Sequence, residues 1–517
     1  MELINILASI TFVLVLIYIY LSWQYNYFKK RGIPTAKGII PGLGHSLPLI
    51  TGQKSIASFY EKFYNDTKEY SMCGIYQFCS PVLLIREPEL IKNVLLTNFS
   101  SFNKNPFKLN CPEKDELLSL NPFFANEEKW KEVRSPFTNS FSGMKLKLMF
   151  PLVQKVGVKI NNYLHKQLKI KNGIFDINLK KLCNKFTGEV SSTGMGIEAN
   201  NFHEELQSNN NMSYNQIIDK LFEPPSSSIG IPVMILFFLP SLAKLLKFSL
   251  TPKVVDQYFR QISKTIINKR KEENLVYNDF VQFMMDYQKL HNTNVNEETL
   301  TAAQMLSFAM DVYETTAITM SYLIMDLASR PEIQDKVRHE ICTLIEKYNG
   351  ELTYDALKEM TYLEKVLNES QRINHIIGVF FKICTKQTKL EGSDGLSCFV
   401  EPGQTIAFSA YGIHMDEKYW QEPEIFNPER FNDDEKSTRH KFTFLPFGEG
   451  PRICVGMRMA VILIKLAVSS ILKDFSVHVS SKMIYPMQRD ESSFLNSPKG
   501  GFWVNMQPLK TDVLSSE

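Results

Sequence analysis

The chain has no large excess of charge of either sign, and its cysteines are not closely paired. It contains 58 Lys and Arg residues against 55 Asp and Glu residues, a formal net charge of +3. This balance gives no reason to expect a nucleic-acid partner. The eight cysteines show none of the spacings of zinc sites and are too sparse for a disulfide scaffold. Cys73 and Cys79 could bridge in an oxidising compartment, but we interpret both as packing residues of a reduced chain that faces the cytosol.

The chain also lacks internal repeats, low-complexity tracts and a dinucleotide-binding glycine fingerprint. With 517 residues, 44% of them hydrophobic, it can bury a large core, and length alone permits two or three domains. Without the fingerprint, electrons from a nicotinamide cofactor would have to arrive through a partner protein.

The longest apolar run lies at the N-terminus and extends from Leu3 to Trp23. It is close to the roughly 20 residues that a helix needs to cross the hydrocarbon layer, so residues 3–23 are predicted to form a transmembrane anchor. A cleaved signal peptide is the alternative. Such a peptide typically has a shorter apolar core and ends in small residues, whereas Tyr18 and Tyr20 lie near the end of this run.

Charge around this run predicts its orientation. Basic residues 29–31 follow the run and only Glu2 precedes it, which places the following domain in the cytosol and the N-terminus in the lumen. Residues 24–45 are basic and rich in Pro and Gly, and are predicted to form a stiff linker that cannot continue the helix. Residues 46–517 are predicted to form one large catalytic domain.

A second apolar stretch extends from Ile229 to Phe248. Pro232 and Pro240 would interrupt a spanning helix, and Lys244 and Lys247 lie on one helical face. We therefore reject a second span. A segment that lies in the membrane interface and a buried pair of core helices both remain open.

Near the C-terminus, one cysteine lies between glycine turns in the run FGEGPRICVG, from Phe447 to Gly456. An apolar helical stretch from Met457 to Leu472 follows directly. The N–H groups and dipole of a helix N-terminus favour an anionic sulfur, so Cys454 is expected to ionise easily and to ligate iron. Arg452 could pair with the carboxylates of a planar macrocycle on that sulfur. A lone cysteine is often an inert buried residue, but the F-x-x-G-x-R-x-C-x-G spacing favours the ligand.

This run resembles the haem-binding loop of the cytochrome P-450 family, and the resemblance reaches from about Pro34 to Pro508. It implies a mainly α fold with a small β-rich portion (α+β), built as one large haem-binding domain with an N-terminal transmembrane helix. It further implies that Cys454 is the axial ligand of haem b (iron protoporphyrin IX), and that Arg452 and Phe447 contact the cofactor. A thiolate in this position favours cleavage of the O–O bond.

One long helix is predicted between Asn296, a good N-cap, and Pro331, a good stop. Glu314, Thr315 and Thr316 lie in its middle. Such buried polar groups must pair locally or serve a wet cavity. The family resemblance implies that Glu314 and Thr315 form an acid–alcohol pair that relays protons during catalysis.

The sequence departs from the family immediately before this pair. Two small residues are usual there, whereas this chain has Asp311 and Val312. A β-branched valine is expected to close the opening that small residues leave beside the oxygen site. An aspartate in this place is expected to be desolvated, with a raised pKa unless it finds a partner.

Further matches to the family surround these motifs. The W-x-x-x-R pattern of Trp130 and Arg134 implies contacts with haem propionates. Glu369 and Arg372 are spaced i, i+3, which by itself is typical of an exposed surface pair. The resemblance instead implies that they form a buried network with Arg430 that holds the cysteine loop.

Three segments match pocket-lining regions of the family by position, namely Phe102–Phe124, Ile376–Phe380 and Ser493–Phe502. They are rich in phenylalanine and other apolar residues, which favours a hydrophobic substrate. His375 precedes one of them, where the family usually has proline nearby, and we interpret it as a structural histidine.

These features predict a monooxygenase of lipophilic small molecules that uses O2. Two electrons would come from NADPH through a separate flavoprotein reductase. Arg134, Arg458 and nearby lysines could bind an acidic face of that reductase. The protein would be a single-pass protein of the endoplasmic reticulum membrane. Two alternatives remain: a haem-thiolate isomerase or dehydratase of an oxygenated lipid, for which Asp311 and Val312 are the motive, and a non-catalytic membrane-bound haem or lipid binder.

Overall fold

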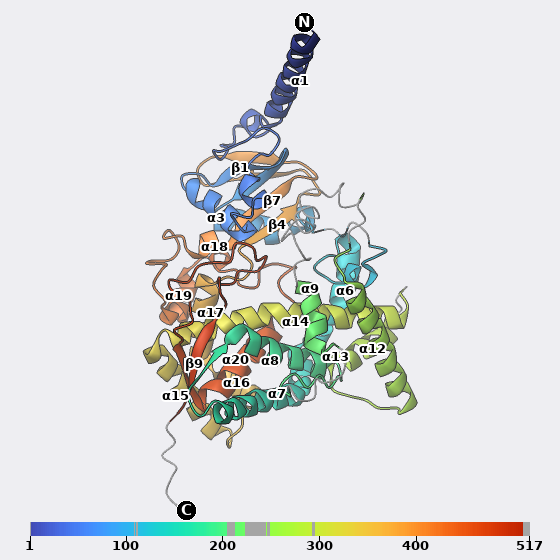
Figure 1. The fold of residues 1–517 in the computed structure, drawn as a ribbon, viewed down its shortest axis with the longest axis vertical. Coiled ribbons are helices and arrows are strands. Elements are labelled where there is room, and N and C mark those ends of the chain that lie inside the picture. The colour runs from blue at the N-terminus through green and yellow to red at the C-terminus, as the bar shows by residue number, and fades with distance from the viewer. Residues whose placement is uncertain are drawn as a thin grey trace, which may run out of the picture.

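The computed structural model describes residues 2–107, 109, 112–203, 212–222, 245, 249–291 and 295–509. The apolar stretch 229–248 lies outside these residues except for Leu245, so its two interpretations stay open. Helices make up most of the described chain. One group of strands lies near the N-terminal helix, and another lies near the C-terminal end of the chain (Figure 1). This arrangement confirms the mainly α fold with a small β-rich portion.

The helices and strands have the following bounds. The helices are α1 (Glu2–Gln24), α2 (Leu47–Ile50), α3 (Ile56–Asp66), α4 (Pro88–Lys92), α5 (Glu116–Ser119), α6 (Glu127–Ser140), α7 (Gly143–Ile170), α8 (Leu179–Gly194), α9 (Tyr214–Phe222), α12 (Lys253–Glu272), α13 (Phe280–Leu290), α14 (Glu297–Ala328), α15 (Pro331–Lys347), α16 (Tyr354–Glu359), α17 (Thr361–Ile373), α18 (Ala410–His414), α19 (Asp433–Thr438) and α20 (Met457–Leu472). The strands are β1 (Met72–Gln77), β2 (Ser80–Ile85), β3 (Phe175–Asn178), β4 (Val379–Ile383), β5 (Thr388–Glu391), β6 (Ser397–Val400), β7 (Thr405–Ser409), β8 (Phe475–Val479) and β9 (Trp503–Pro508).

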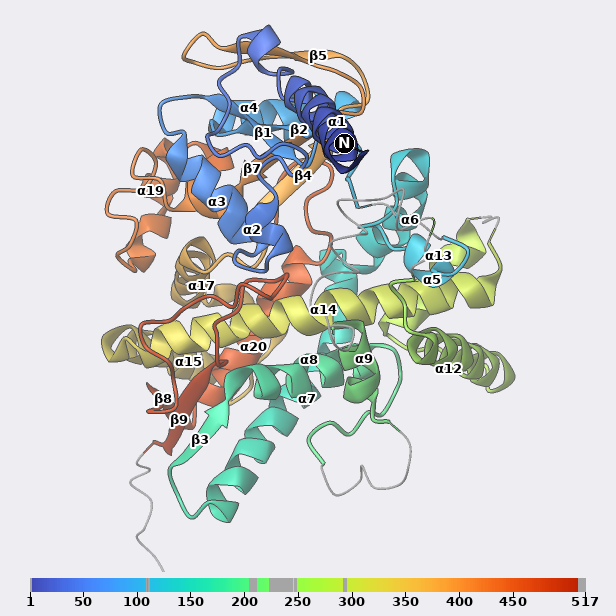
Figure 2. The ribbon, with the colours of Figure 1, turned by 45° about the horizontal axis from the view of Figure 1, so that its top comes forward.

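Helix α14 crosses the molecule between the β-rich part and helices α7 and α8 (Figure 2). It begins where the Asn296 side chain accepts the backbone N–H groups of Glu298 and Thr299, and it ends before Pro331. Most of its residues are buried around the whole circumference, as expected of a helix in the centre of a large domain. The predicted long helix is therefore confirmed.

The main sheet joins strands from distant parts of the chain in the order β1-β2-β7-β4. Its neighbours are antiparallel except for β2 and β7, which pair in parallel between Val82 and Thr405 and onward to Leu84 and Ala407. A second, antiparallel sheet has the order β3-β9-β8, and β5 and β6 form a separate hairpin. One core surrounds α14 and α20, and another lies against the main sheet.

Helix α1 extends away from the rest of the protein (Figure 1). The apolar segment Ile4–Arg31 is long enough to cross a membrane, and its most apolar window is not buried against the protein. Directly after α1, the ring of Phe28 is fully buried and packs on Tyr76 of β1 at a centroid distance of 5.5 Å. A Cβ at Gly74 would lie 2.2 Å from the Phe28 ring, so only glycine at position 74 leaves room for the ring. The apolar helix is thereby tied closely to the main sheet.

Candidate active site

The loop before α20 holds Cys454 by tight turns. The backbone N–H of Cys454 donates to the carbonyl of Phe447 at 2.9 Å. Gly448 and Gly450 adopt left-handed φ values of 70° and 78°. A Cβ on Gly450 would also lie 2.1 Å from the carbonyl oxygen of Leu95, so this position requires glycine for two reasons. The glycines of the motif therefore fix the place of the sulfur.

The electrostatics of the Cys454 sulfur differ from the expectation. Burial raises the pKa of the thiol to about 11. The backbone N–H groups of Gly456 and Met457 and the charge of Arg134 lower it, as expected of a helix N-terminus, but they do not offset burial. The prediction that Cys454 ionises easily is therefore wrong for the protein alone. A thiolate at this position needs a cation bound to its sulfur. Iron bound by Cys454 would supply that cation.

Two arginines flank the indole ring of Trp130 on α6. The guanidinium carbon of Arg452 lies 4.5 Å from the ring centroid, and that of Arg134 lies 5.6 Å away. Nη2 of Arg134 also donates to the carbonyl of Ile453 at 2.5 Å, directly beside Cys454. The structure thus brings together four of the residues that the sequence singled out.

The hydrogen bonds of Arg452 leave its charge uncompensated. Its guanidinium donates to the carbonyl of Ala125 at 3.1 Å, with longer contacts to Pro122 and Asn126, and its Nε is buried without a partner. Burial lowers the pKa of Arg452 to about 10, and the nearby charge of Arg134 adds to the effect. In the part of the chain that the structure describes, no carboxylate pairs with either arginine.

A third cation of this cluster, Lys382, was missed by sequence analysis. It lies on β4, is only 7% exposed, and its Nζ donates to Oδ1 of Asn105 at 2.8 Å. Burial lowers the pKa of Lys382 to about 7, and the charge of Arg452 contributes. The available signal was a single lysine in an otherwise apolar strand, V-F-F-K-I.

These cations fit a cofactor with carboxylates at its edge. Unpaired buried charge is costly, so three cations without a described carboxylate partner favour an anionic ligand, and the orphaned Nε of Arg452 offers a free donor. Arg134, Arg452 and Lys382 would hold the two propionates of haem, and Trp130 would pack beside them. Cys454 would supply a sulfur ligand to the iron.

The residues in the middle of α14 divide between two faces. The hydroxyl of Thr315 donates to the backbone carbonyl of Asp311 at 2.6 Å, and both side chains remain accessible to water. Glu314 is buried instead and pairs with Nζ of Lys180 on α8 at 2.5 Å. Asp311 and Thr315 therefore share one face, and Glu314 points toward α8.

Asp311 faces the cysteine loop from α14. Burial raises the pKa of its carboxyl to about 7, as the sequence predicted for an aspartate in this place. Its charge in turn raises the pKa of Cys454. Both side chains are accessible to water. Val312 lies partly buried against the helical core.

The predicted network behind the loop is also present. Glu369 accepts two hydrogen bonds from Arg372, at 2.7 and 2.8 Å, and both side chains are fully buried. Nε of Arg430 lies 3.4 Å from the same carboxylate, and the backbone N–H of Asn427 donates to it at 2.9 Å. Since Arg372 also donates to the carbonyls of His414 and Pro423, the network joins α17 to the chain that leads into the loop.

His375 is a structural residue, as the sequence predicted. Its Nδ1 accepts the backbone N–H of Ile377 at 3.1 Å, so its Nε2 donates to the carbonyl of Leu445 at 2.9 Å. Burial lowers the pKa of His375 to about 4, which keeps the ring neutral.

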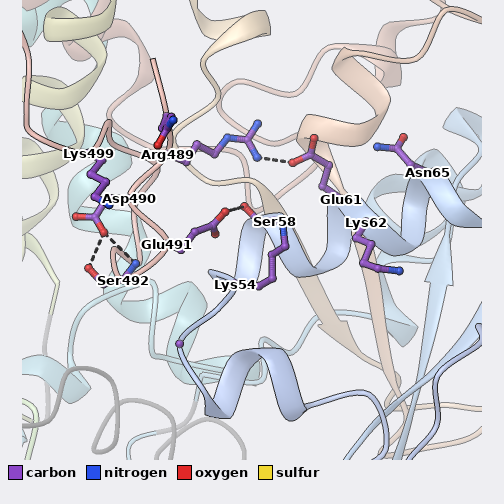
Figure 3. Close-up of a pocket in the computed structure, with 12 residues that line it drawn as sticks. Lys54, Ser58, Glu61, Lys62, Asn65, Arg489, Asp490, Glu491, Ser492 and Lys499 are labelled. Atoms are coloured by element: carbon purple, nitrogen blue, oxygen red, sulfur yellow. Dashed lines mark hydrogen bonds and ion pairs between the residues drawn. The ribbon is translucent and has the colours of Figure 1, made fainter. Parts of the chain in front are cut away.

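A separate cavity of about 720 Å³ lies between α3 and the segment 488–499 (Figure 3). Its carboxylates are already paired: Arg489 binds Glu61, and Glu491 accepts the hydroxyl of Ser58 at 3.0 Å. Lys499, from the segment Ser493–Phe502, lines this cavity, but Cys454, Arg452, Arg134 and the other predicted site residues do not. These contacts hold the C-terminal segment against α3 and do not extend the Cys454 site.

The family model described as cytochrome P-450 matches residues 34–504. The chain belongs to the cytochrome P-450 family. It is 30% identical to Cytochrome P-450 6B2 of Helicoverpa armigera, over 97% of this chain and 98% of that protein. It is 30% identical to Probable cytochrome P-450 6a13 of Drosophila melanogaster and 29% identical to Cytochrome P-450 9e2 of Blattella germanica, each over 96% of this chain and 97% of the relative. This P-450 is therefore a haem-dependent oxidoreductase of the monooxygenase class.

Proposed function

We propose that this P-450 inserts one oxygen atom from O2 into a lipophilic small molecule, with haem b held by Cys454. The observation that carries the proposal is the position of Arg134 and Arg452 against Trp130 beside the cysteine loop, with Lys382 near Arg452. None of the three cations has a described carboxylate partner. Haem, when bound, supplies the oxidising chemistry, and the protein supplies orientation and electrostatics. Phe447 adds an apolar contact from the loop.

The protein's own residues would manage the proton. Lys180 is 37% exposed and binds the buried Glu314, so Glu314 lies between solvent and the middle of α14. Thr315 follows it in the chain, and its side chain stays partly accessible to water on the face that it shares with Asp311. We assign Glu314 and Thr315 to proton delivery. Thr315→Ala should then consume NADPH with less product, which is measured as the ratio of product formed to NADPH oxidised.

Electrons would come from NADPH through a separate flavoprotein reductase. Arg458, at the start of α20, is exposed and can meet an acidic partner, whereas Arg134 is engaged with Ile453. The apolar segment Ile4–Arg31 and the basic residues after it support a single-pass anchor in the endoplasmic reticulum membrane with the catalytic domain in the cytosol.

The deciding experiment is a reduced, carbon monoxide difference spectrum of membranes that carry this protein. We expect the Soret band of a thiolate-ligated haem, and its loss in Cys454→Ala. Its absence from folded wild-type protein would refute the proposal.

One alternative keeps the haem but not the oxygen chemistry. Asp311 and Val312 replace the usual small residues, so an isomerase or dehydratase of an oxygenated lipid is the second candidate. Product formation that requires NADPH and reductase supports the monooxygenase. Consumption of a lipid peroxide without NADPH supports the second candidate, and a haem-loaded protein that does neither is a binder.

A further inference from the structure

Two buried histidines hold the backbone of Leu445 at both of its polar groups. The backbone N–H of Leu445 donates to Nε2 of His414 at 2.8 Å, and its carbonyl accepts the Nε2 proton of His375 at 2.9 Å. Both imidazole rings are buried, and their centroids lie 4.9 Å apart. Leu445 lies outside the helices and strands, so the two side chains replace the partners that a helix or sheet would give its backbone.

The two rings are fixed in opposite tautomers. His375 accepts the backbone N–H of Ile377 at Nδ1, so its proton lies on Nε2. His414 accepts at Nε2, so its proton lies on Nδ1, which is buried without a described partner. A buried N–H without a partner costs stability. The contribution of the His414 ring is therefore the acceptor that it offers to Leu445.

Leu445 lies one turn before the residue that holds Cys454. Its carbonyl also accepts the backbone N–H of Gly448 at 3.1 Å, which closes a turn around Phe447. The carbonyl of Phe447 in turn accepts the backbone N–H of Cys454 at 2.9 Å. Backbone hydrogen bonds therefore link the position of Leu445 to that of the cysteine.

His414 also contacts the buried network of Glu369 and Arg372. Nη1 of Arg372 donates to the backbone carbonyl of His414 at 2.9 Å. His414 thus contacts the network through its backbone and the cysteine loop through its ring. It connects the most deeply buried ion pair of this region to the chain that leads to Cys454.

The two histidines should differ in weight. Without the ring of His375, the carbonyl of Leu445 keeps its hydrogen bond from Gly448. Without the ring of His414, the N–H of Leu445 is buried with no described partner. Such an N–H favours any displaced loop in which it finds an acceptor, so His414 should be the more important contact.

We propose that His414 and His375 are positioning residues for Cys454, which act through the backbone of Leu445 to hold the sulfur where it ligates iron as a thiolate. This role rests on the proposed function, because it takes Cys454 as the haem ligand. In a displaced loop, the sulfur would be held less firmly against the iron, and part of the haem would lack a thiolate ligand.

The test is the reduced, carbon monoxide difference spectrum of the purified, haem-loaded full chain. Its Soret band separates haem with a thiolate ligand from haem without one, because a thiolate pushes electron density onto iron. His414→Leu removes the acceptor for the Leu445 N–H. In His414→Gln the amide oxygen can reach the place of Nε2 and accept the same N–H.

His45→Leu is the matched control. His45 is 3% exposed, its Nδ1 accepts the backbone N–H of Tyr76 at 3.0 Å, and its Nε2 lies 3.0 Å from the carbonyl of Ala36. His45→Leu therefore removes the partner of a buried backbone N–H, as His414→Leu does. The N–H that it leaves belongs to β1 and not to the cysteine loop.

We expect His414→Leu to raise the ratio of haem without a thiolate ligand to haem with one about fivefold or more over the wild type, since an unpartnered buried N–H shifts an equilibrium by at least about this factor. His414→Gln should restore the wild-type ratio, and His375→Leu should raise it less than His414→Leu. His45→Leu should lower the Tm without changing the ratio, which distinguishes positioning from a general loss of stability.

A wild-type ratio in His414→Leu would overturn the proposal. So would equal ratios in His414→Leu and His45→Leu, or a ratio in His414→Gln as high as in His414→Leu. If His414→Leu does not load haem, His375→Leu and His375→Gln decide by the same comparison, because the amide of Gln can still donate to the Leu445 carbonyl. A wild type without the thiolate band would refute the proposed function as well, whereas a normal wild-type band with unchanged variants would refute this role alone.

Discussion

The buried carboxylate of Glu369 offers the sharpest test of what holds the cysteine loop in place. In Glu369→Gln the side chain keeps its shape but loses its charge. Arg372 is fully buried and Arg430 largely so, and both would then lack their counter-charge. The new amide could also turn an N–H₂ group toward a guanidinium that has only donors. We therefore expect a large loss of stability.

The magnitude follows from the burial. Removing one partner of a buried ion pair costs about 3–5 kcal/mol, because the remaining charge stays unpaired. The unfolding entropy of globular proteins is about 2.1 cal/mol/K per residue, or about 1.1 kcal/mol/K for a chain of 517 residues. The Tm of Glu369→Gln should therefore fall by about 3–5 °C.

The assay is a thermal melt of the haem-loaded protein, followed by circular dichroism and by Soret absorbance. Glu128→Gln is the matched control, since Glu128 and Lys131 form an i, i+3 pair like Glu369 and Arg372 but are 83% and 64% exposed. Such exposed pairs contribute about 0–1 kcal/mol, so the control should melt within about 1 °C of the wild type. Equal shifts in the two variants would refute the reasoning from burial.

Three further predictions concern the site itself. Gly450→Ala should prevent haem loading, since its Cβ would lie 2.1 Å from the Leu95 carbonyl. Gly403 also has a left-handed φ, of 90°, but open space around it, so the control Gly403→Ala should lose some stability and still load haem. The haem content per protein distinguishes the two variants. Lys382→Met should raise the Tm of the haem-free protein, because it removes a buried charge. The same variant should lose haem faster when apomyoglobin is added as the haem acceptor. An unchanged rate of haem loss would exclude Lys382 from the cofactor site. Burial raises the pKa of Asp311 from 3.8 to about 7, so the folded protein holds this proton more tightly than the unfolded chain does, and ionisation costs stability between these values. Asp311→Asn should therefore gain Tm relative to the wild type as the pH rises from about 4 to about 7 and gain no more above it, and a constant difference would contradict this.

Features written in local spacing were predictable from the sequence. The bounds of α14 follow from the Asn296 cap and from Pro331, and the turns around Cys454 follow from glycines that adopt left-handed φ values. The burial of Glu369 and Arg372 was different, because an i, i+3 pair is normally exposed. Only the family resemblance, which supplied Arg430, pointed to the interior.

Features that depend on tertiary packing were not predictable. Lys382 joins Arg452 because β4 pairs with β7, and no local pattern gives that neighbourhood. Asn121 meets Asp311 from a turn 190 residues earlier in the chain. The pKa of Cys454 was predicted in the wrong direction because the helix N-terminus is visible in the sequence, whereas the protein that buries the sulfur is not.

The parallel pairing of β2 with β7 has a consequence during synthesis. The two strands are separated by 405 − 85 = 320 positions. At about 5–20 residues per second, the ribosome needs roughly 15–65 s after completing β2 to deliver its partner. Strand β2 has left the ribosome well before then, so the nascent chain carries an unfinished apolar strand edge during this time. A chaperone that shields this edge should increase the yield of folded enzyme.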